Sequence, residues 1–291
     1  MTLVWASGYN GITDPDAQTY IAAVEAADGQ AIENDVALAI NDFVVGCKLD
    51  GIWDAIKASC ILAGARTLSG ALVPLKGTAP TNNNFVSGDY NRETGLVGNS
   101  STKFLNSNRN SNADPQNNNH LAVFVSSAGT NAVYDVYIGV RGPSQIGTTQ
   151  LGRSVPVGQF IAIRDEPGYT QILTPQPTGF IGGSRSDSGS ISARLNSATV
   201  SVSSTSETVP NLNHYVLARN NNGTLDGQTN GRLSFYSIGE SIDLEQLDTR
   251  TTRLMNLISY SLASGLPDLS TMDLDAASYI GAVYRAGGTL S

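Results

Sequence analysis

Oxygen-bearing side chains alternate in one polar stretch of the chain. Asn108, Asn110, Asn112 and Asp114 stand two residues apart, as ligands do in loops that wrap a calcium ion. The stretch has a single carboxylate, no glycine at the turn position and no glutamate where a calcium loop needs it. The alternative is an asparagine-rich turn that bonds to its own backbone. Calcium is therefore the one metal that the sequence suggests, and both interpretations stay open.

Carboxylates occur close together in two places. A glycosidase needs two of them on either side of a sugar, and Asp165 with Glu166, or Glu240 with Asp243 and Glu245, are the candidates. Neighbours in a strand point to opposite faces, so Asp165 and Glu166 do not share a cleft in regular strand. The second group stands where a strand leads into a helix, and acids favour helix N-termini. Both sets are predicted to be structural.

Nucleophilic chemistry has no recognisable motif here. The sequence contains no Gly-x-Ser-x-Gly elbow, and its two histidines, His120 and His214, lie far apart. Cys47 and Cys60 fall within apolar patterns and are predicted to be buried, reduced thiols. We expect no catalytic residues and no cofactor other than calcium, which makes a glycan depolymerase the least favoured function.

The composition restricts the partners. Charged residues make up 14% of the chain, against roughly 25% in an ordinary domain, so amides and hydroxyls supply the polar surface. This surface suits protein packing and sugar hydroxyls. A net charge of -8 without a basic cluster argues against nucleic acid. No apolar run is long enough to span a membrane, and the first residues lack the features of a signal peptide.

Aromatic side chains are the remaining candidates for sugar contacts, because sugar rings stack on them. The candidates are five tyrosines of the strand-rich region: Tyr90, Tyr134, Tyr137, Tyr169 and Tyr236. Most are expected in the core or in cross-strand pairs. One or two at loop ends could form a shallow sugar site, and the sequence does not select which.

The chain divides into five parts by pattern. An N-terminal arm (1–13) precedes a helical segment (14–65), a β-sandwich (66–242), a helix packed on the sandwich (243–264), and a linker with a C-terminal helix (265–291). The helical segment is predicted to hold three helices. Asp14 caps the first, with Pro15 in its first turn. The third is predicted to start at Asp50 and to carry Ile52, Trp53, Ile56 and Cys60 on one face.

The strand-rich region predicts an antiparallel sandwich. No helical pattern separates its apolar runs, so parallel crossover units are not expected. The polar tract 106–119 is predicted to be a long ordered loop. The strand candidates are 68–75, 120–126, 133–140, 159–164, 179–185, 191–195, 198–203, 213–219 and 232–238.

The two ends of the chain carry similar segments. The residues from Asp14 to Val24 return near the C-terminus as Asp273 to Val283, which indicates one helix used twice. The repeated apolar positions are predicted to act in assembly: Tyr20, Ile21 and Val24 in the first copy, and Tyr279, Ile280 and Val283 in the second. The second copy could dock where the first docks, on the same or a neighbouring subunit. The alternative is a duplication remnant packed on its own domain.

Two stretches are distinctive: residues 82–105 (NNNFVSGDYNRETGLVGNSSTKFL) and 232–244 (RLSFYSIGESIDL). With the opening that leads to Gly46-Cys47-Lys48 and Asp50-Gly51-Ile52-Trp53, they resemble virion structural proteins of tailed bacteriophages, cyanophages among them. Many of these are labelled tail fibre or minor structural protein. The strand region resembles a concanavalin A-like (laminin-G-like) jelly roll, and many such domains bind sugars, often with calcium.

The resemblance implies a non-enzymatic virion protein, made in the host cytoplasm. On this reading it is a tail fibre or receptor-binding component that displays a lectin-like domain to the host surface. The alternative is a capsid decoration protein. The implied partners are other virion proteins, copies of the same chain and a host surface glycan. No residue matches a known sugar or calcium site of such domains, so none is carried over.

Overall fold

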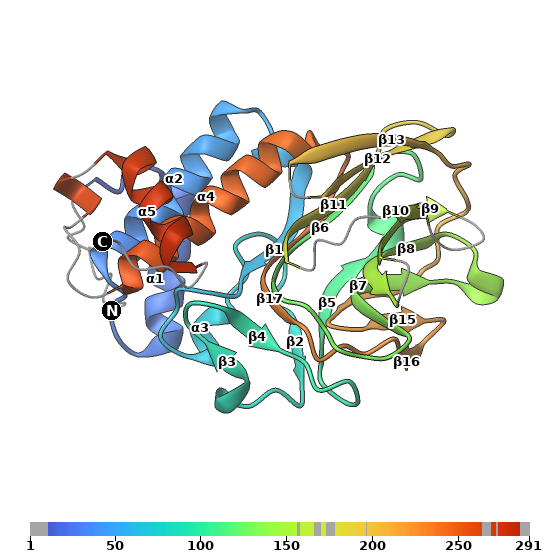
Figure 1. Cartoon of the computed structure of the whole chain (residues 1–291), viewed down its shortest axis with the longest axis horizontal. Coiled ribbons are helices and arrows are strands. Elements are labelled where there is room, and N and C mark those ends of the chain that lie inside the picture. The colour runs from blue at the N-terminus through green and yellow to red at the C-terminus, as the bar shows by residue number, and fades with distance from the viewer. Residues whose placement is uncertain are drawn as a thin grey trace, which may run out of the picture.

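Two β-sheets stack face to face, and helices gather on one side of the stack (Figure 1). The computed structural model describes residues 11–155, 158–165, 170–172, 178–195, 197–263, 269–271 and 273–285. Within these residues the chain is a β-sandwich with additional helices, as the strand patterns predicted. The short 3₁₀ turns are η1 (Trp53–Ala55), η2 (Ser87–Asp89), η3 (Ser111–Ala113), η4 (Pro143–Gln145) and η5 (Leu269–Thr271).

Sheet A lies next to the helices. Its order is β13 (Ala198–Ser203), β12 (Ser190–Leu195), β11 (Gly179–Arg185), β6 (Asn119–Ser127), β17 (Arg232–Gly239), β4 (Gly95–Val97) and β3 (Tyr90–Asn91). The eighth strand, β1 (Ile56–Ile61), pairs with the second half of β17. All of these pairs are antiparallel.

Sheet B forms the other layer. Its order is β10 (Thr170–Ile172), β9 (Gly158–Asp165), β8 (Thr148–Ser154), β7 (Tyr134–Arg141), β14 (Asn213–Val216), β5 (Phe104–Asn110) and β2 (Thr81–Asn83). A hairpin of β15 (Arg219–Asn221) and β16 (Thr224–Asp226) joins it, with β15 running parallel to β7.

The space between the sheets is filled by branched and aromatic side chains. Alternate residues of β6 and β9 point into it, and so do residues of β8, β11 and β17. These side chains are buried and form one cluster: Leu121, Val123, Val125, Leu151, Ile161, Ile163, Ile181, Leu233, Tyr236 and Ile238. The opposite alternation therefore places a second set of side chains on the outer face of each sheet.

The outer face of sheet A, here called the covered face, packs against helices. Phe124, Phe180 and Phe235 belong to the same buried cluster as residues of α2 (Asn34–Leu49) and α4 (Leu244–Leu262). The rings of Phe43 and Phe235 meet edge to face at 5.7 Å between centroids. A buried ion pair, from Arg194 Nε to Asp248 Oδ2 at 2.8 Å, fixes α4 to β12. The helical layer is therefore part of the core.

The N-terminal helix forms as its sequence predicts. In α1 (Pro15–Asp28) the Asp14 carboxylate accepts hydrogen bonds from the amides of Asp16 (2.9 Å) and Ala17 (3.3 Å). Gly29 ends the helix at φ 70°, a conformation that glycine adopts without strain. The described helices contain no segment long and apolar enough to cross a membrane.

Two predictions about local structure are wrong. The third N-terminal helix is absent: Trp53–Ala55 is a single 3₁₀ turn, and Ile56–Ile61 is strand β1. Ile56 and Ile61 face the helices while Ala58 and Cys60 face the sandwich core, and a short run that is apolar on both faces does not distinguish strand from helix. The predicted strand at 68–75 begins instead as the short helix α3 (Leu68–Ala71), capped by Thr67.

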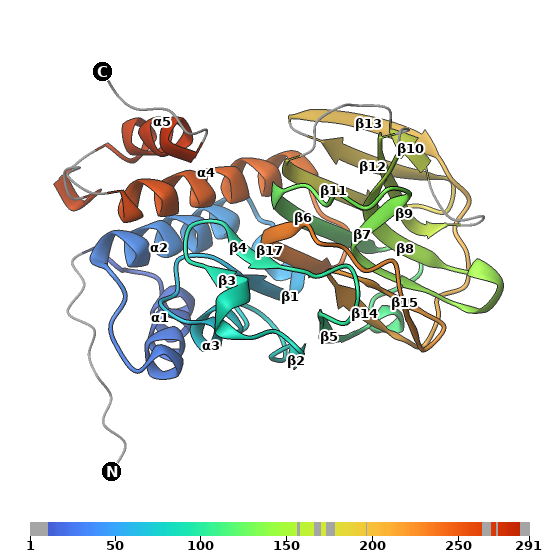
Figure 2. The ribbon, with the colours of Figure 1, turned by 60° about the horizontal axis from the view of Figure 1, so that its bottom comes forward.

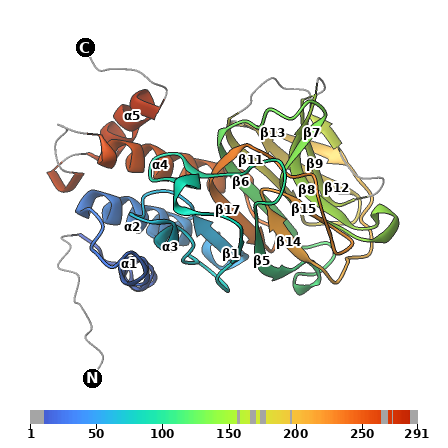
Figure 3. The ribbon, with the colours of Figure 1, turned by 90° about the horizontal axis from the view of Figure 1, so that it is seen from below.

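The C-terminal part follows the predicted order of two helices. Asp243 caps α4, accepting from the amides of Glu245 and Gln246. The repeated segment is helix α5 (Leu274–Arg285), which lies on α4, while α1 lies on the other side of the α2–α4 pair (Figures 2 and 3). The second copy thus packs on its own chain, and at a different place from the first.

The two copies bury different faces of similar helices. Tyr20 is 6% exposed in α1, whereas its counterpart Tyr279 is 72% exposed in α5. The α5 helix contacts α4 through Ala277 and Gly281, and a side-chain carbon on Gly281 would come within 1.8 Å of the Asn256 carbonyl. The face that α1 uses inward is therefore turned outward in α5.

Candidate functional site

The side chains predicted to bind calcium do not form a set that is free to bind an ion. The first half of the polar tract is strand β5 and not loop, which corrects that expectation; Leu105 and Ser107 are buried there at alternate positions. Asp114 is 3% exposed and its carboxylate is paired with the guanidinium of Arg109. This carboxylate is the one charged ligand of the predicted calcium set.

The asparagines of that set are engaged in hydrogen bonds within the protein. Asn108 donates its amide to the carbonyl of Ala79 at 2.8 Å, and the Asn110 side chain accepts from the amide of Asn112 at 3.0 Å. The bond between Asn110 and Asn112 is the one expected of a self-bonded turn, whereas Asn108 bonds to a residue 29 positions away. Among the described residues, no group of three or more histidine, cysteine or acidic side chains is placed to hold a metal.

The candidate catalytic acids are engaged in structural contacts. Asp243 caps α4, and Glu240 pairs with Lys57 at 3.2 Å. Glu245 lies 3.9 Å from Arg194. Asp165 is buried at the end of β9, and Glu166 lies outside the described residues. Asp243, Glu240 and Glu245 thus each contact a backbone or charged group of the protein itself.

The thiols and the imidazoles are buried. Both cysteines are free and buried, as predicted, and burial raises the pKa of Cys60 to about 12. His120 donates through Nδ1 to the Glu240 carbonyl, so its Nε2 accepts from the Ser237 hydroxyl at 2.7 Å. Burial lowers the pKa of His120 to about 4. At neutral pH these groups act as uncharged core residues.

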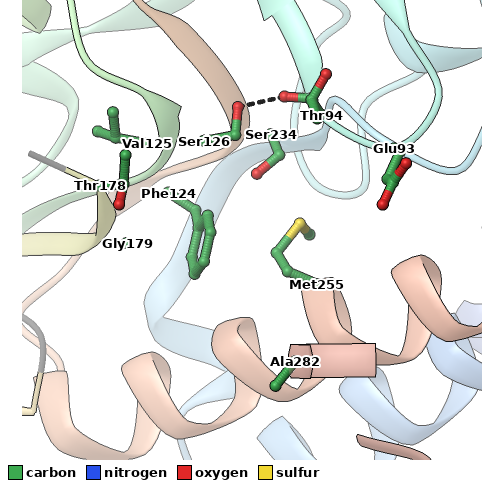
Figure 4. A pocket seen from close by; sticks show the side chains of 10 residues that line it. All are labelled: Glu93, Thr94, Phe124, Val125, Ser126, Thr178, Gly179, Ser234, Met255 and Ala282. Atoms are coloured by element: carbon green, nitrogen blue, oxygen red, sulfur yellow. Dashed lines mark hydrogen bonds between the residues drawn. The ribbon is translucent and has the colours of Figure 1, made fainter. Parts of the chain in front are cut away.

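One pocket lies between the helical layer and sheet A, with a volume of about 260 Å³. Phe124, Met255 and Ala282 provide apolar walls (Figure 4). At the rim Ser126 donates its hydroxyl to the Thr94 carbonyl. The pocket is mostly apolar, and we assign it no chemistry.

A second pocket lies on the outer face of sheet B, here called the open face. The helices α1, α2, α4 and α5 all lie on the side of sheet A (Figures 1 and 2). Leu151 and Ile161 point into the sandwich, so Gln150 and Phe160 point outward. The open-face pocket has a volume of about 400 Å³ and is lined by Val133, Tyr134, Arg141, Gln145, Gln150, Ser154, Phe160, Arg219 and Asp226.

The β15–β16 hairpin carries Arg219 and Asp226, and the third charged residue of the pocket, Arg141, ends β7. Arg219 and Asp226 are direct cross-strand partners, and their side chains form an ion pair at 2.5 Å. The hairpin turns at Asn222 and Gly223, with φ of 51° and 89°. Asn-Gly favours this left-handed pair of conformations.

A hydrogen-bond network fixes the ion pair. Arg219 donates to the Gln150 side-chain oxygen at 2.7 Å, and Tyr134 donates its hydroxyl to Asp226 at 2.8 Å. Burial acts to raise the pKa of Asp226, but the hydrogen bond and charge of Arg219 outweigh it and lower that pKa below its ordinary value. Burial and the bond to Asp226 raise the pKa of Tyr134. The carboxylate is ionised and the phenol neutral at physiological pH.

The tyrosines expected near sugars sort into two kinds. Tyr137 and Tyr236 are buried in the sandwich core, and Tyr90 donates its hydroxyl to the Ala65 carbonyl. Tyr134 alone of the five lines the open-face pocket, whereas Tyr169 lies outside the described residues. The pocket combines an aromatic wall with amide, hydroxyl and guanidinium groups, so its groups can bind a polar ligand by hydrogen bonds.

Sequence reasoning missed most of this pocket. Seven of its residues come from five strands and two, Val133 and Gln145, from outside them, and no strand contributes more than two polar side chains. The Asn222-Gly223 turn between two short runs was the available signal, because Asn-Gly is a strong hairpin indicator. It would have placed Arg219 opposite Asp226.

No protein-family model matches the chain, and no curated protein matches it in sequence. Among solved structures, the binding domain of botulinum neurotoxin serotype D is 11% identical with a TM-score of 0.47, covering 67% of this chain and 50% of that one. The Ruminococcus gnavus IT-sialidase CBM40 is 9% identical with a TM-score of 0.39, covering 58% and 96%.

A mutant of NanB sialidase from Streptococcus pneumoniae is 10% identical with a TM-score of 0.40. The match covers 54% of this chain, which spans only 27% of that sialidase chain. With TM-scores below 0.5, these likenesses carry no statement about what this chain binds.

Proposed function

We propose that this chain is a non-catalytic virion protein of a tailed bacteriophage that binds a glycan in its open-face pocket. Its sandwich is a jelly roll of the concanavalin A-like type, displayed on a tail fibre towards the host surface. The observation that carries the glycan-binding part is the pocket itself. Tyr134 and Phe160 supply an aromatic wall, and Gln145, Ser154 and Arg141 supply hydrogen-bonding groups around it.

The chemistry of the pocket fits a sugar better than an apolar ligand. Sugar recognition pairs ring stacking with hydrogen bonds to hydroxyls, and side-chain amides both donate and accept. The pocket volume of about 400 Å³ falls in the usual range for small-ligand sites. The low share of charged residues, 14%, leaves a surface of amides and hydroxyls suited to such a ligand.

A binding role without catalysis agrees with the positions of the acids. Asp226 is the acidic residue of the open-face pocket, and it is held by Arg219 and Tyr134. Hydrolysis of a glycosidic bond needs a second carboxyl group nearby.

The virion assignment rests on the resemblance carried by residues 82–105 and 232–244. These stretches adjoin in sheet A: β4 pairs with β17 through Leu96 and Leu233, and Arg232 donates to the Gly95 carbonyl at 2.6 Å. The distinctive residues thus belong to one structural unit. We place the protein in the particle, after synthesis in the host cytoplasm, with other virion proteins and copies of itself as partners.

The helical end is proposed to join copies of the chain. Tyr279 is 72% exposed, and Ile280 and Val283 are partly exposed beside it. Replacing Tyr279 with Ser should reduce self-association in sedimentation velocity and leave the melting temperature within a degree or two, because an exposed side chain contributes little to folding. Deleting 270–291 should abolish association. Unchanged association in both variants would overturn this part of the proposal.

The decisive experiment is a glycan array probed with the full chain, with and without calcium. Binding that is lost on replacing Phe160 and Tyr134 with Ala would support the lectin role. If no glycan on the array binds, the alternative of a capsid decoration protein is favoured. Electron microscopy of labelled particles would then locate the protein on the shell or the tail.

A further inference from the structure

Two arginines share the open-face pocket. Arg219 lies opposite Gly139 in the β15–β7 ladder, and Arg141 lies two residues further along β7. Residues two apart on a strand point to the same face, which agrees with both side chains lining the pocket. Two guanidinium groups therefore border one space.

Asp226 carries the one carboxylate among the residues that line this pocket. Asp226 accepts from Arg219, from the Tyr134 hydroxyl and from the Asn221 side-chain amide at 3.1 Å. Both carboxylate oxygens of Asp226 therefore already accept hydrogen bonds from neighbouring side chains. Among the ion pairs of the described residues, none includes Arg141, and its buried Nε–H has no hydrogen-bond partner. The Nε–H of Arg219 is likewise without a partner.

An unpaired guanidinium in a pocket is costly to keep. Burial and the neighbouring charge of Arg219 lower the pKa of Arg141, and the charge of Asp226 offsets this only in part. The chain as a whole carries a net charge of -8, yet within the described residues no carboxylate forms an ion pair with Arg141; Asp226 acts on it only through its charge. A ligand that brings a carboxylate would satisfy the missing hydrogen bonds, because the planar guanidinium matches a carboxylate with two parallel bonds.

We propose that the ligand of the open-face pocket is a carboxylated sugar, whose carboxylate binds Arg141 and whose ring lies against Phe160 and Tyr134. This inference rests on the proposed glycan-binding function and goes beyond it by naming the class of sugar. Arg219, already paired with Asp226, positions the pocket wall and adds positive potential.

The test compares matched oligosaccharides on the full chain by isothermal titration calorimetry. The probes are oligogalacturonate, the same oligosaccharide after carboxyl reduction, and a sulfated neutral oligosaccharide. We expect oligogalacturonate to bind at least about tenfold more tightly than the reduced form, since a charged hydrogen-bonded pair contributes roughly 1.5–3 kcal/mol. Equal affinity for the reduced or sulfated probe would overturn the carboxylate assignment.

Two variants locate the contact. Arg141→Gln should remove the preference for the acid, whereas Lys57→Gln, which deletes one positive charge on sheet A, should keep it. Preserved preference in Arg141→Gln would overturn the assignment to this residue. If that variant does not fold, judged by circular dichroism, the probe comparison on the wild type still decides. Failure of every carbohydrate to bind would overturn the proposed function as well, whereas binding of the reduced probe alone would leave it standing.

Discussion

The two outer faces of the sandwich differ in what lies against them. The covered face of sheet A presents Phe124, Phe180 and Phe235 to the helices, and these three rings are buried. The open face of sheet B presents Arg141, Gln150 and other polar groups around a pocket. The same period-two alternation produces both faces. The comparison teaches that the described helices complete the core on one side and leave the other side, with its polar pocket, uncovered.

The largest effect should come from a matched pair of phenylalanines. Phe235→Ala removes a fully buried ring on the covered face and should lower the free energy of unfolding by about 3–5 kcal/mol, measured by urea denaturation. Ligand affinity of the folded protein should stay unchanged. Phe160→Ala, on the open face, should weaken ligand binding as well as stability, because its ring lines the pocket but is only 4% exposed. Equal loss of binding in both variants would break the separation of the two faces.

Acid should destabilise both sheets through their buried histidines. Burial lowers the pKa of His120 in sheet A to about 4 and that of His214 in sheet B to about 3, against roughly 6.5 in an unfolded chain. Between these values the unfolded state binds more protons than the native state, so stability falls as pH drops from about 6.5 to about 4. Denaturation curves across this range measure the slope.

The histidine variants separate the two sheets. His120→Gln and His214→Gln should each make the slope shallower. A slope that is the same in both variants and the wild type would show that carboxylates alone govern the acid sensitivity.

A smaller effect is expected at the pocket carboxylate. Asp226→Asn removes the negative charge that neutralises Arg219 and should raise the affinity for a carboxylated sugar roughly 2- to 5-fold, the size of a partly exposed ion-pair contribution. The melting temperature should fall slightly as the ion pair is lost. Weaker binding in this variant would indicate that Asp226 contacts the ligand directly. Asp187→Asn, at an exposed turn, is the matched control.

The smallest effect should come from calcium. Because Arg109 already occupies the carboxylate of Asp114, millimolar calcium should leave the melting temperature within about a degree of the value in a chelator. A rise of several degrees, abolished by Asp114→Asn, would instead establish an ion site at the end of sheet B. Differential scanning fluorimetry is sufficient for this measurement.

The sequence predicted those elements whose pattern is local. Alternation predicted β13 and a short run bounded by turn residues predicted β11, both to the residue, and the caps Asp14 and Asp243 marked the starts of α1 and α4. Strand β1 was misread because both of its faces are buried, which removes the alternation. Strand β8 was not recognised because threonine, glutamine and arginine predominate in it.

The site was harder to predict than the fold for a physical reason. Arg141, Gln150 and Arg219 are unremarkable in sequence, and only the pairing of β7 with β8 and β15 brings them together. Tyr134 was among the predicted sugar-contacting residues, but the sequence could not separate it from the core residue Tyr137. The unpaired state of Arg141 is a property of three-dimensional packing alone.

Strand β1 has a consequence for anyone dissecting this protein into fragments. It pairs with β17 from Ile61 opposite Phe235 to Ile56 opposite Gly239, and Leu62 adds a bond to the Ser234 carbonyl. A recombinant fragment that begins at the sequence-based boundary, residue 66, would lack β1 and leave half of β17 as an unpaired sheet edge. Such edges recruit strands from other molecules. A clean excision therefore has to begin upstream of residue 56, carrying the apolar helices with it.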